Sequence, residues 1–296
     1  MKKVLSVLLV LMMTAAIFAG CATAPAASST PASSETPASS EAPASSKPVA
    51  PALSGKVTLT GSSSMQTLVE ALIESFKAVE PGVTVECQYP GSGQGMTAAA
   101  EGTVDIGNAS RELKETEAAN LDAHVVAIDG IAVVVNSANA VADLKAEDVF
   151  KIFTGEIKNW KDVGGSDAPI VVIGRDEASG TRSAFEELLK IADPVKPVYA
   201  QELTSTGTVK STVASTPDAI GYISLDAVDA TVKAVKLDGV DATAENVLAG
   251  TYKLSRPFVM ATKKGTTLSE QAQAFLDYAL SDAGKAVAES VGLVVG

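Results

Sequence analysis

The segment GRDEASGTR, from Gly174 to Arg182, places two arginines, two carboxylates and a Ser-Gly-Thr triplet within nine residues. It follows the apolar run Ile170–Ile173, which is typical of a buried strand, and precedes three apolar residues at helical spacing, Phe185, Leu188 and Leu189. The triplet therefore stands at the start of a predicted helix, where free N–H groups and the positive end of the helix dipole attract anions. The segment predicts an anion site between a strand and a helix, with a solvated surface loop as the alternative.

Other Ser/Gly loops stand at similar junctions. Gly61–Ser64 follows the predicted strand Val57–Thr60, and Pro90–Gly95 follows Val83–Cys87 and precedes an Ala-rich helix. A fourth loop, Thr204–Thr208, also precedes a short apolar-periodic run. A serine in such a place is most often only a helix N-cap, but four junctions in one chain favour a shared function. Alternating strands and helices predict an α/β fold with parallel sheets, whose ligands bind beyond the C-terminal ends of the strands.

The N-terminus has the pattern of an exported lipoprotein. Lys2 and Lys3 precede an apolar run, 4–19, that is typical of a signal peptide and too short to predict a transmembrane helix. Phe18–Cys21 is similar to a lipobox, with phenylalanine where leucine is more usual. The similarity implies a signal peptide over residues 1–20 and lipidation of Cys21. An uncleaved anchor and a secreted form without lipid are the alternatives.

Residues 21–54 predict a lipidated cysteine followed by a tether of Ala, Ser, Pro, Thr and Glu. This composition offers too few large apolar side chains to offset the entropy of ordering, so we expect a disordered segment. Its roughly thirty residues would span about 30 Å. The rest of the chain, about 240 residues from Gly55 onward, is enough for one large or two modest domains.

The net charge and the cysteine content argue against some classes of function and against a disulfide. The chain has 23 basic and 35 acidic residues, a formal charge of −12, which becomes −14 when Lys2 and Lys3 leave with the signal peptide. Such an acidic protein is not expected to bind nucleic acid or a broad anionic-lipid surface, although a small cationic pocket stays possible. The two cysteines are Cys21 and Cys87, so with Cys21 lipidated we expect no disulfide.

Enzymatic chemistry finds little support in the sequence. The single histidine, His124, excludes a histidine metal cluster and precedes an apolar strand, where a structural role is expected. Neither a G-x-x-x-x-G-K-[ST] phosphate loop nor a G-x-S-x-G nucleophile elbow occurs. Gly91–Gly95 departs from a dinucleotide fingerprint because its third glycine comes one residue early. We therefore expect no catalytic residue, metal or cofactor, and a protein that is not an enzyme.

Seven segments, taken in order, resemble the periplasmic or lipid-anchored phosphate-binding proteins of ABC importers, and the resemblance covers nearly all of residues 55–296. GRDEASGTR is the most telling of them. The others are TGSSSM (60–65), PGSGQG (90–95), DIGNASR (105–111), FTGEIKNW (153–160), AIGY (219–222) and LSRPF (254–258).

The resemblance implies an α/β fold of two periplasmic-binding-protein-like lobes, with a ligand cleft between the lobes and two crossover segments. Lobe I would comprise residues 55–129 and 256–296, and lobe II residues 130–255. The crossings would be Ile131–Val135 and Leu254–Met260. Closure of the lobes around an anion would then be a hinge motion.

The resemblance also implies the site residues. Arg175 would grip phosphate with its two-pronged guanidinium, which lysine lacks, and Glu177 would orient that guanidinium. The other phosphate-binding residues carried over are Ser63, Ser64, Ser92, Ser110, Arg111, Ser179, Gly180 and Thr181.

At Arg111 the chain departs from many relatives, which have aspartate there. That aspartate accepts the proton of hydrogen phosphate and rejects fully ionised sulfate. A subgroup with Ser-Arg at this point exists, and Arg111 would add positive charge to the site. Asp176 is a candidate substitute for the missing acceptor.

The function implied is a monomeric solute-binding lipoprotein on the outer face of the cell membrane. It would capture inorganic phosphate and deliver it to the membrane subunits of an ABC permease. One alternative keeps the fold and changes the anion to sulfate, molybdate or tungstate. Others are a secreted phosphohydrolase, which would need a metal cluster or an activated nucleophile, and an adhesin that uses the tether.

Overall fold

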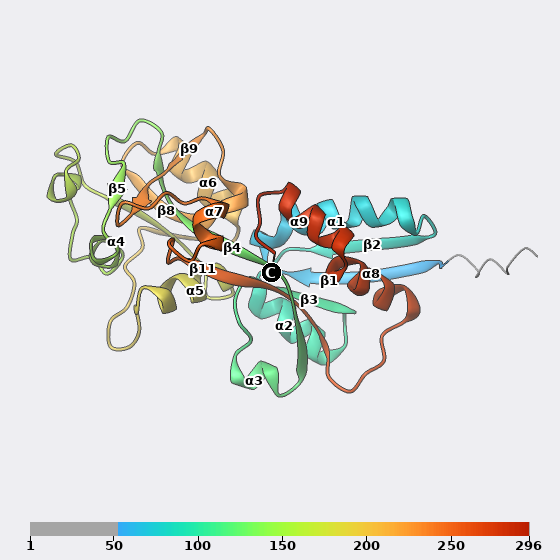
Figure 1. Ribbon diagram of the computed structural model, residues 1–296. Coiled ribbons are helices and arrows are strands. Elements are labelled where there is room, and N and C mark those ends of the chain that lie inside the picture. The colour runs from blue at the N-terminus through green and yellow to red at the C-terminus, as the bar shows by residue number, and fades with distance from the viewer. Residues whose placement is uncertain (1–52, 296) are drawn as a thin grey trace, which may run out of the picture. The chain divides into compact units, whose positions relative to one another are not determined.

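A computed structural model describes residues 53–295, whose helices and strands Figure 1 shows. The predicted signal peptide, Cys21 and nearly all of the predicted tether lie outside these residues. No helix within the described range is long and apolar enough to cross a bilayer.

Within residues 53–295, nine strands form one mixed sheet. They are β1 (Gly55–Gly61), β2 (Val83–Gln88), β3 (Ile106–Ala109), β4 (Leu121–Asn136), β6 (Val171–Arg175), β7 (Gln201–Leu203), β8 (Ala219–Ser224), β9 (Val232–Ala234) and β11 (Ser255–Lys263). Their order is β2-β1-β3-β11-β4-β8-β6-β7, with β9 paired to β4. A separate parallel pair consists of β5 (Asp143–Leu144) and β10 (Lys236–Leu237).

The helices connect these strands. They are η1 (Ser63–Met65), α1 (Gln66–Val79), α2 (Ser92–Glu101), α3 (Glu115–Ala118), α4 (Ala146–Phe153), η2 (Trp160–Val163), α5 (Gly180–Leu188), α6 (Thr206–Ser215), η3 (Leu225–Ala227), α7 (Ala244–Leu248), α8 (Glu270–Leu280) and α9 (Asp282–Ser290). The four predicted Ser/Gly loops lead into η1, α2, α5 and α6, as the sequence pattern indicated.

Lobe I is built on the parallel strands β2, β1 and β3. Its core contains the apolar stripe of α1, which includes Leu68, Leu72 and Phe76, and this helix ends just before Pro81-Gly82. The C-terminal helices α8 and α9 lie beside α1 (Figure 1). The Phe76 and Phe275 rings meet edge to face with their centroids 5.3 Å apart, so the two ends of the described chain share one core.

Lobe II is built on the parallel strands β8, β6 and β7. Its core contains the fully buried Trp160, whose indole Nε1 donates to the Asp218 carbonyl at 3.0 Å. Phe185 of α5 stacks on Tyr222 of β8 with 4.1 Å between ring centroids. This stacking fixes α5 against the sheet and thereby the position of its N-terminus.

Two long strands join the lobes. The strand β4 pairs with β11 from Leu121 to Gly130 and then with β8 from Ile131 to Val135. These pairings are antiparallel, so the expectation of parallel sheets holds within each lobe and fails at the crossings. The strands form a mixed sheet because the chain returns through β11 in the opposite direction to β3 and β4. The predicted lobe boundaries stay a prediction.

Candidate functional site

Arg175 lies at the C-terminal end of β6 and is buried. Its guanidinium donates only to neutral oxygens: the carbonyls of Leu203 at 3.2 Å and Thr204 at 3.0 Å, and the hydroxyls of Thr206 at 3.3 Å and Ser63 at 3.1 Å. Burial lowers the pKa of Arg175 to about 10, so the side chain stays positive at neutral pH. The arrangement is a buried cation without a carboxylate partner among the described residues.

Glu177 does not orient Arg175, contrary to the sequence prediction. Its side chain is exposed, and the carbonyls of Leu203 and Thr204 hold the guanidinium instead. The second arginine of the segment braces the loop: Arg182 donates to the Arg175 carbonyl at 2.8 Å and to Glu186 at 2.7 Å. Arg182 also pairs with Glu202 at 2.9 Å. Of the two arginines of the segment, Arg182 is therefore held by carboxylates, whereas Arg175 has no carboxylate partner within residues 53–295.

The Ser-Gly-Thr triplet caps α5 as predicted. The Ser179 hydroxyl accepts from the Arg182 N–H at 3.2 Å, and Gly180 and Thr181 form the first turn. A Cβ at Gly180 would lie 2.2 Å from the Ser92 Oγ and 2.9 Å from the Ser110 Oγ. Only glycine therefore lets the two serines of lobe I approach this helix N-terminus.

The first loop reaches across to lobe II through its hydroxyls. The Ser64 Oγ hydrogen-bonds to Thr181 at 2.7 Å and to Thr206 at 2.9 Å. The Ser63 Oγ accepts from the Thr206 N–H at 3.2 Å, in addition to Arg175. The N-termini of α5 and α6 thus meet η1 directly.

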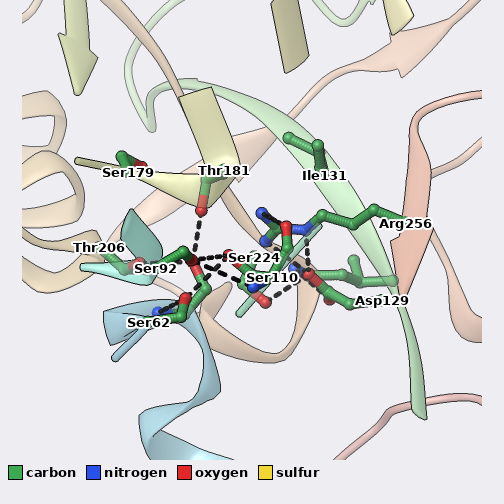
Figure 2. Close-up of polar contacts among 12 residues, drawn as sticks. Ser62, Ser92, Ser110, Asp129, Ile131, Ser179, Thr181, Thr206, Ser224 and Arg256 are labelled. Atoms are coloured by element: carbon green, nitrogen blue, oxygen red, sulfur yellow. Dashed lines mark hydrogen bonds and ion pairs between the residues drawn. The ribbon is translucent and has the colours of Figure 1, made fainter. Parts of the chain in front are cut away.

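Ser92 and Ser110 complete the cluster from the other loops of lobe I, as Figure 2 shows. The Ser110 N–H donates to the Ser92 Oγ at 3.2 Å, and the Ser62 hydroxyl donates to the Ser110 Oγ at 2.8 Å. The Gly93 N–H donates to the Ala178 carbonyl at 3.0 Å, which ties the second loop to the GRDEASGTR segment. Hydrogen bonds therefore link four of the five predicted serines, Ser63, Ser64, Ser92 and Ser110, with Thr181 and Arg175. The fifth, Ser179, caps α5.

Arg111 points elsewhere. Its guanidinium makes a two-pronged pair with Glu117, at 2.7 and 2.8 Å, and donates to the Glu112 carbonyl at 2.8 Å. Burial acts to raise the pKa of Glu117, but the hydrogen bonds from Arg111 and the Lys114 N–H outweigh it and lower that pKa. The Arg111 guanidinium is thus held in an ion pair with Glu117 and makes no hydrogen bond to the serine cluster among the described residues.

Three residues of this site were not predicted individually. Ser62 and Thr206 belong to two of the predicted loops, and Arg256 belongs to the LSRPF segment. Arg256 pairs with Asp129 at 2.8 Å and donates to the Ser110 carbonyl at 3.1 Å. Its burial could be suspected from Leu254 and Phe258, two positions away on either side, but no local signal indicated its partner.

Chemically, the site is a convergence of hydrogen-bond donors. Hydroxyl groups, the N-termini of α2, α5 and α6, and one buried guanidinium meet at the junction of the lobes. Such a set suits a small oxyanion. No cluster of three His, Cys, Asp or Glu that could hold a metal ion occurs among residues 53–295. Asp176 follows Arg175 directly in the sequence. Its Oδ1 atom is buried and has no hydrogen-bond partner among the described residues.

Comparison with known proteins gives consistent relatives. A family model described as a PBP superfamily domain matches residues 27–283. The phosphate-binding protein PstS of Bacillus subtilis is 38% identical over 235 residues, which are 77% of this chain and 76% of the relative. A Clostridium perfringens structure, described as a candidate phosphate ABC transporter substrate-binding protein with bound phosphate, is 42% identical with a TM-score of 0.79. The match covers 82% of this chain and 100% of the Clostridium perfringens chain.

A second solved structure agrees. An ABC-type phosphate transport receptor from Vibrio cholerae is 34% identical with a TM-score of 0.68, and the match covers 81% of this chain and 100% of the receptor.

Proposed function

Because the chain belongs to the family of phosphate-binding proteins of ABC transporters, within the PBP superfamily, we propose that it captures inorganic phosphate between its lobes. It then delivers the anion to the membrane subunits of an ABC import permease. The protein carries out no reaction on its ligand; it selects the anion and hands it on.

The observation that carries this proposal is the state of Arg175. A buried guanidinium whose hydrogen bonds all go to neutral oxygens leaves a positive charge in a site of low dielectric. Burying an uncompensated charge costs free energy, and an anion offsets that cost. Phosphate, with its four oxygens, can accept from the guanidinium, the hydroxyls and the helix N–H groups together.

We assign the phosphate ligands to the residues that converge on this charge. They are Arg175, Ser63, Ser64, Ser92, Ser110, Ser179, Gly180 and Thr181. Arg111 is left out because Glu117 occupies it. Asp176, with its buried free oxygen, is the candidate acceptor for the proton of hydrogen phosphate.

The rest of the chain supports delivery. We propose that residues 1–20 direct export, that Cys21 carries the lipid anchor on the outer face of the cell membrane, and that residues 21–54 form the tether. The protein acts as a monomer. Its lobe I (55–129 and 256–296) and lobe II (130–255) close around the anion.

A thermal-shift panel tests this function. The whole chain, freed of bound anion by unfolding and refolding, is melted with phosphate, sulfate, molybdate or tungstate. A ligand at a hundred times its Kd adds about 2.7 kcal/mol to stability. Phosphate alone should raise Tm strongly. A larger shift with sulfate, molybdate or tungstate would favour the alternative anion, and no shift with any of them would exclude oxyanion binding.

A further inference from the structure

A fully buried ion pair joins the two crossing strands. Asp129 on β4 and Arg256 on β11 face each other in register. Their side chains are 0% and 1% exposed, and Arg256 Nη2 lies 2.8 Å from Asp129 Oδ2. The guanidinium Nε donates to the same oxygen at 3.2 Å. Figure 2 shows this pair beside Ser110.

The pair also connects the two lobes at the site. On the lobe I side, Arg256 Nη1 donates to the Ser110 carbonyl at 3.1 Å. On the lobe II side, Asp129 accepts from the Ser224 hydroxyl at 2.7 Å and from the Leu225 N–H at 3.2 Å. One chain of hydrogen bonds therefore runs from a serine of the anion cluster, through both crossing strands, to the end of β8.

The chemistry of this pair fits a positioning role. A buried ion pair contributes little net stability compared with apolar residues of the same volume, but its geometry is demanding. Arginine has five N–H donors in a fixed fork, so Arg256 can bind Asp129 and the Ser110 carbonyl together. Lysine, a compact ammonium on a flexible stem, lacks this fork.

We propose that the Asp129–Arg256 pair is the positioning element that holds the Ser110 loop of lobe I in register with lobe II when the cleft is closed. This inference rests on the proposed function, because it assigns the pair to phosphate capture. Neither residue contacts the anion. The pair acts through the Ser110 carbonyl on one side and through Ser224 on the other.

Two variants separate positioning from plain stability. Arg256→Lys keeps the charge and removes the fork. Ser224→Ala removes only the lobe II hydroxyl, and Asp129 keeps Arg256 and the Leu225 N–H. Phe275→Leu is the matched control, because it disturbs the buried core of lobe I and touches no residue of the network.

Closure is read as a distance between nitroxide labels. The labels are placed at the exposed positions Val79 in lobe I and Leu248 in lobe II, in the whole chain with Cys21 and Cys87 changed to serine. Phosphate affinity is measured by calorimetry on the same proteins, well below the melting temperature of each.

We expect Arg256→Lys to weaken phosphate binding by about tenfold or more and to leave part of the population open at saturating phosphate. Ser224→Ala should also lower the phosphate affinity and the closed fraction, but by less than Arg256→Lys does. Phe275→Leu should lower Tm with wild-type affinity and closure.

Wild-type closure and affinity in Arg256→Lys would overturn the positioning role while the phosphate function stands. An equal loss of affinity in Phe275→Leu would also overturn it, by showing that affinity follows stability alone. If the parent chain itself does not bind phosphate, the proposed function fails and the inference fails with it.

Discussion

The hydroxyl oxygens of Ser64 and Thr181 lie 2.7 Å apart, although 117 positions separate the two residues in the sequence. One belongs to the first loop of lobe I and the other to the first turn of α5 in lobe II. Their contact brings the two helix-start loops face to face, so donors from both lobes can act on one anion.

Replacing Arg175 with alanine should remove most of the phosphate affinity. The guanidinium is the buried cation of the site, and removing one partner of a buried charged pair costs about 2–5 kcal/mol of binding free energy. Calorimetric titration with phosphate measures the loss. Glu177→Gln is the control: because Glu177 is exposed, we expect wild-type affinity. Unchanged binding in Arg175→Ala would refute the site assignment.

Gly180→Ala should weaken phosphate binding at least tenfold, about 1.4 kcal/mol. The added methyl group would lie 2.2 Å from the Ser92 Oγ and so would push the second loop away from α5. Gly207→Ala, in the first turn of α6, is the matched control because a Cβ there meets nothing within 4 Å. Equal affinities for the two variants would contradict the closed geometry at Gly180.

Arg111→Met should lower stability by about 1–3 kcal/mol, since it leaves the half-buried Glu117 without its charged partner. Phosphate affinity should stay within about twofold of the wild type, because the guanidinium is directed at Glu117. Denaturant unfolding and calorimetry give the two quantities. Glu117→Gln breaks the same pair, so it should also lower stability and leave the phosphate affinity near the wild-type value. A loss of affinity in Arg111→Met but not in Glu117→Gln would restore Arg111 to the phosphate site.

Asp226 should make stability depend on pH near neutrality. Both of its carboxylate oxygens are buried without a hydrogen-bond partner among the described residues. Burial, and then the nearby Asp129 carboxylate, raise its pKa to about 7. Thr67 of α1 and the Asp129, Arg256 and Ser224 network act on this carboxyl, and Glu70, Lys210 and Asp229 line the same pocket.

A carboxyl whose folded pKa is raised binds its proton more tightly in the folded state. Its stabilising contribution is complete below the unfolded pKa of about 4 and is lost as pH rises through about 7. Denaturant unfolding at about pH 5 and about pH 8.5 should show the loss in the wild type and a smaller loss in Asp226→Asn. Asp122→Asn changes the same charge at an exposed position and should follow the wild type. An undiminished loss in Asp226→Asn would mean that another group is responsible.

Local patterns were enough to predict much of the fold. The apolar run Ile170–Ile173 and the spacing after it gave a strand and a helix, because strand and helix periodicity are properties of the residues themselves. Helix α1 likewise ends just before Pro81-Gly82, because a proline inside a helix removes a backbone hydrogen bond and clashes with the preceding turn. The antiparallel crossing strands needed long-range pairing, for which the sequence of β4 or β11 alone contains no signal.

The site shows the same division. The serines and Arg175 were predicted because they sit in recognisable loops. The role of Glu177 was assigned through the resemblance, but the carbonyls that hold the Arg175 guanidinium come from Leu203 at the end of β7 and from Thr204 directly after it. The partners of Arg111 and Arg256 could not be chosen in advance, because many carboxylates were available and only the folded chain decides which one is near.

The most direct test of the account is calorimetric titration of the anion-free chain with phosphate and then with sulfate, at pH values on both sides of the second ionisation of phosphate. The account predicts tight 1:1 binding of phosphate and no heat from sulfate. Binding of sulfate as tightly as phosphate, or of neither anion, would contradict a phosphate site built on Arg175 and the serine loops.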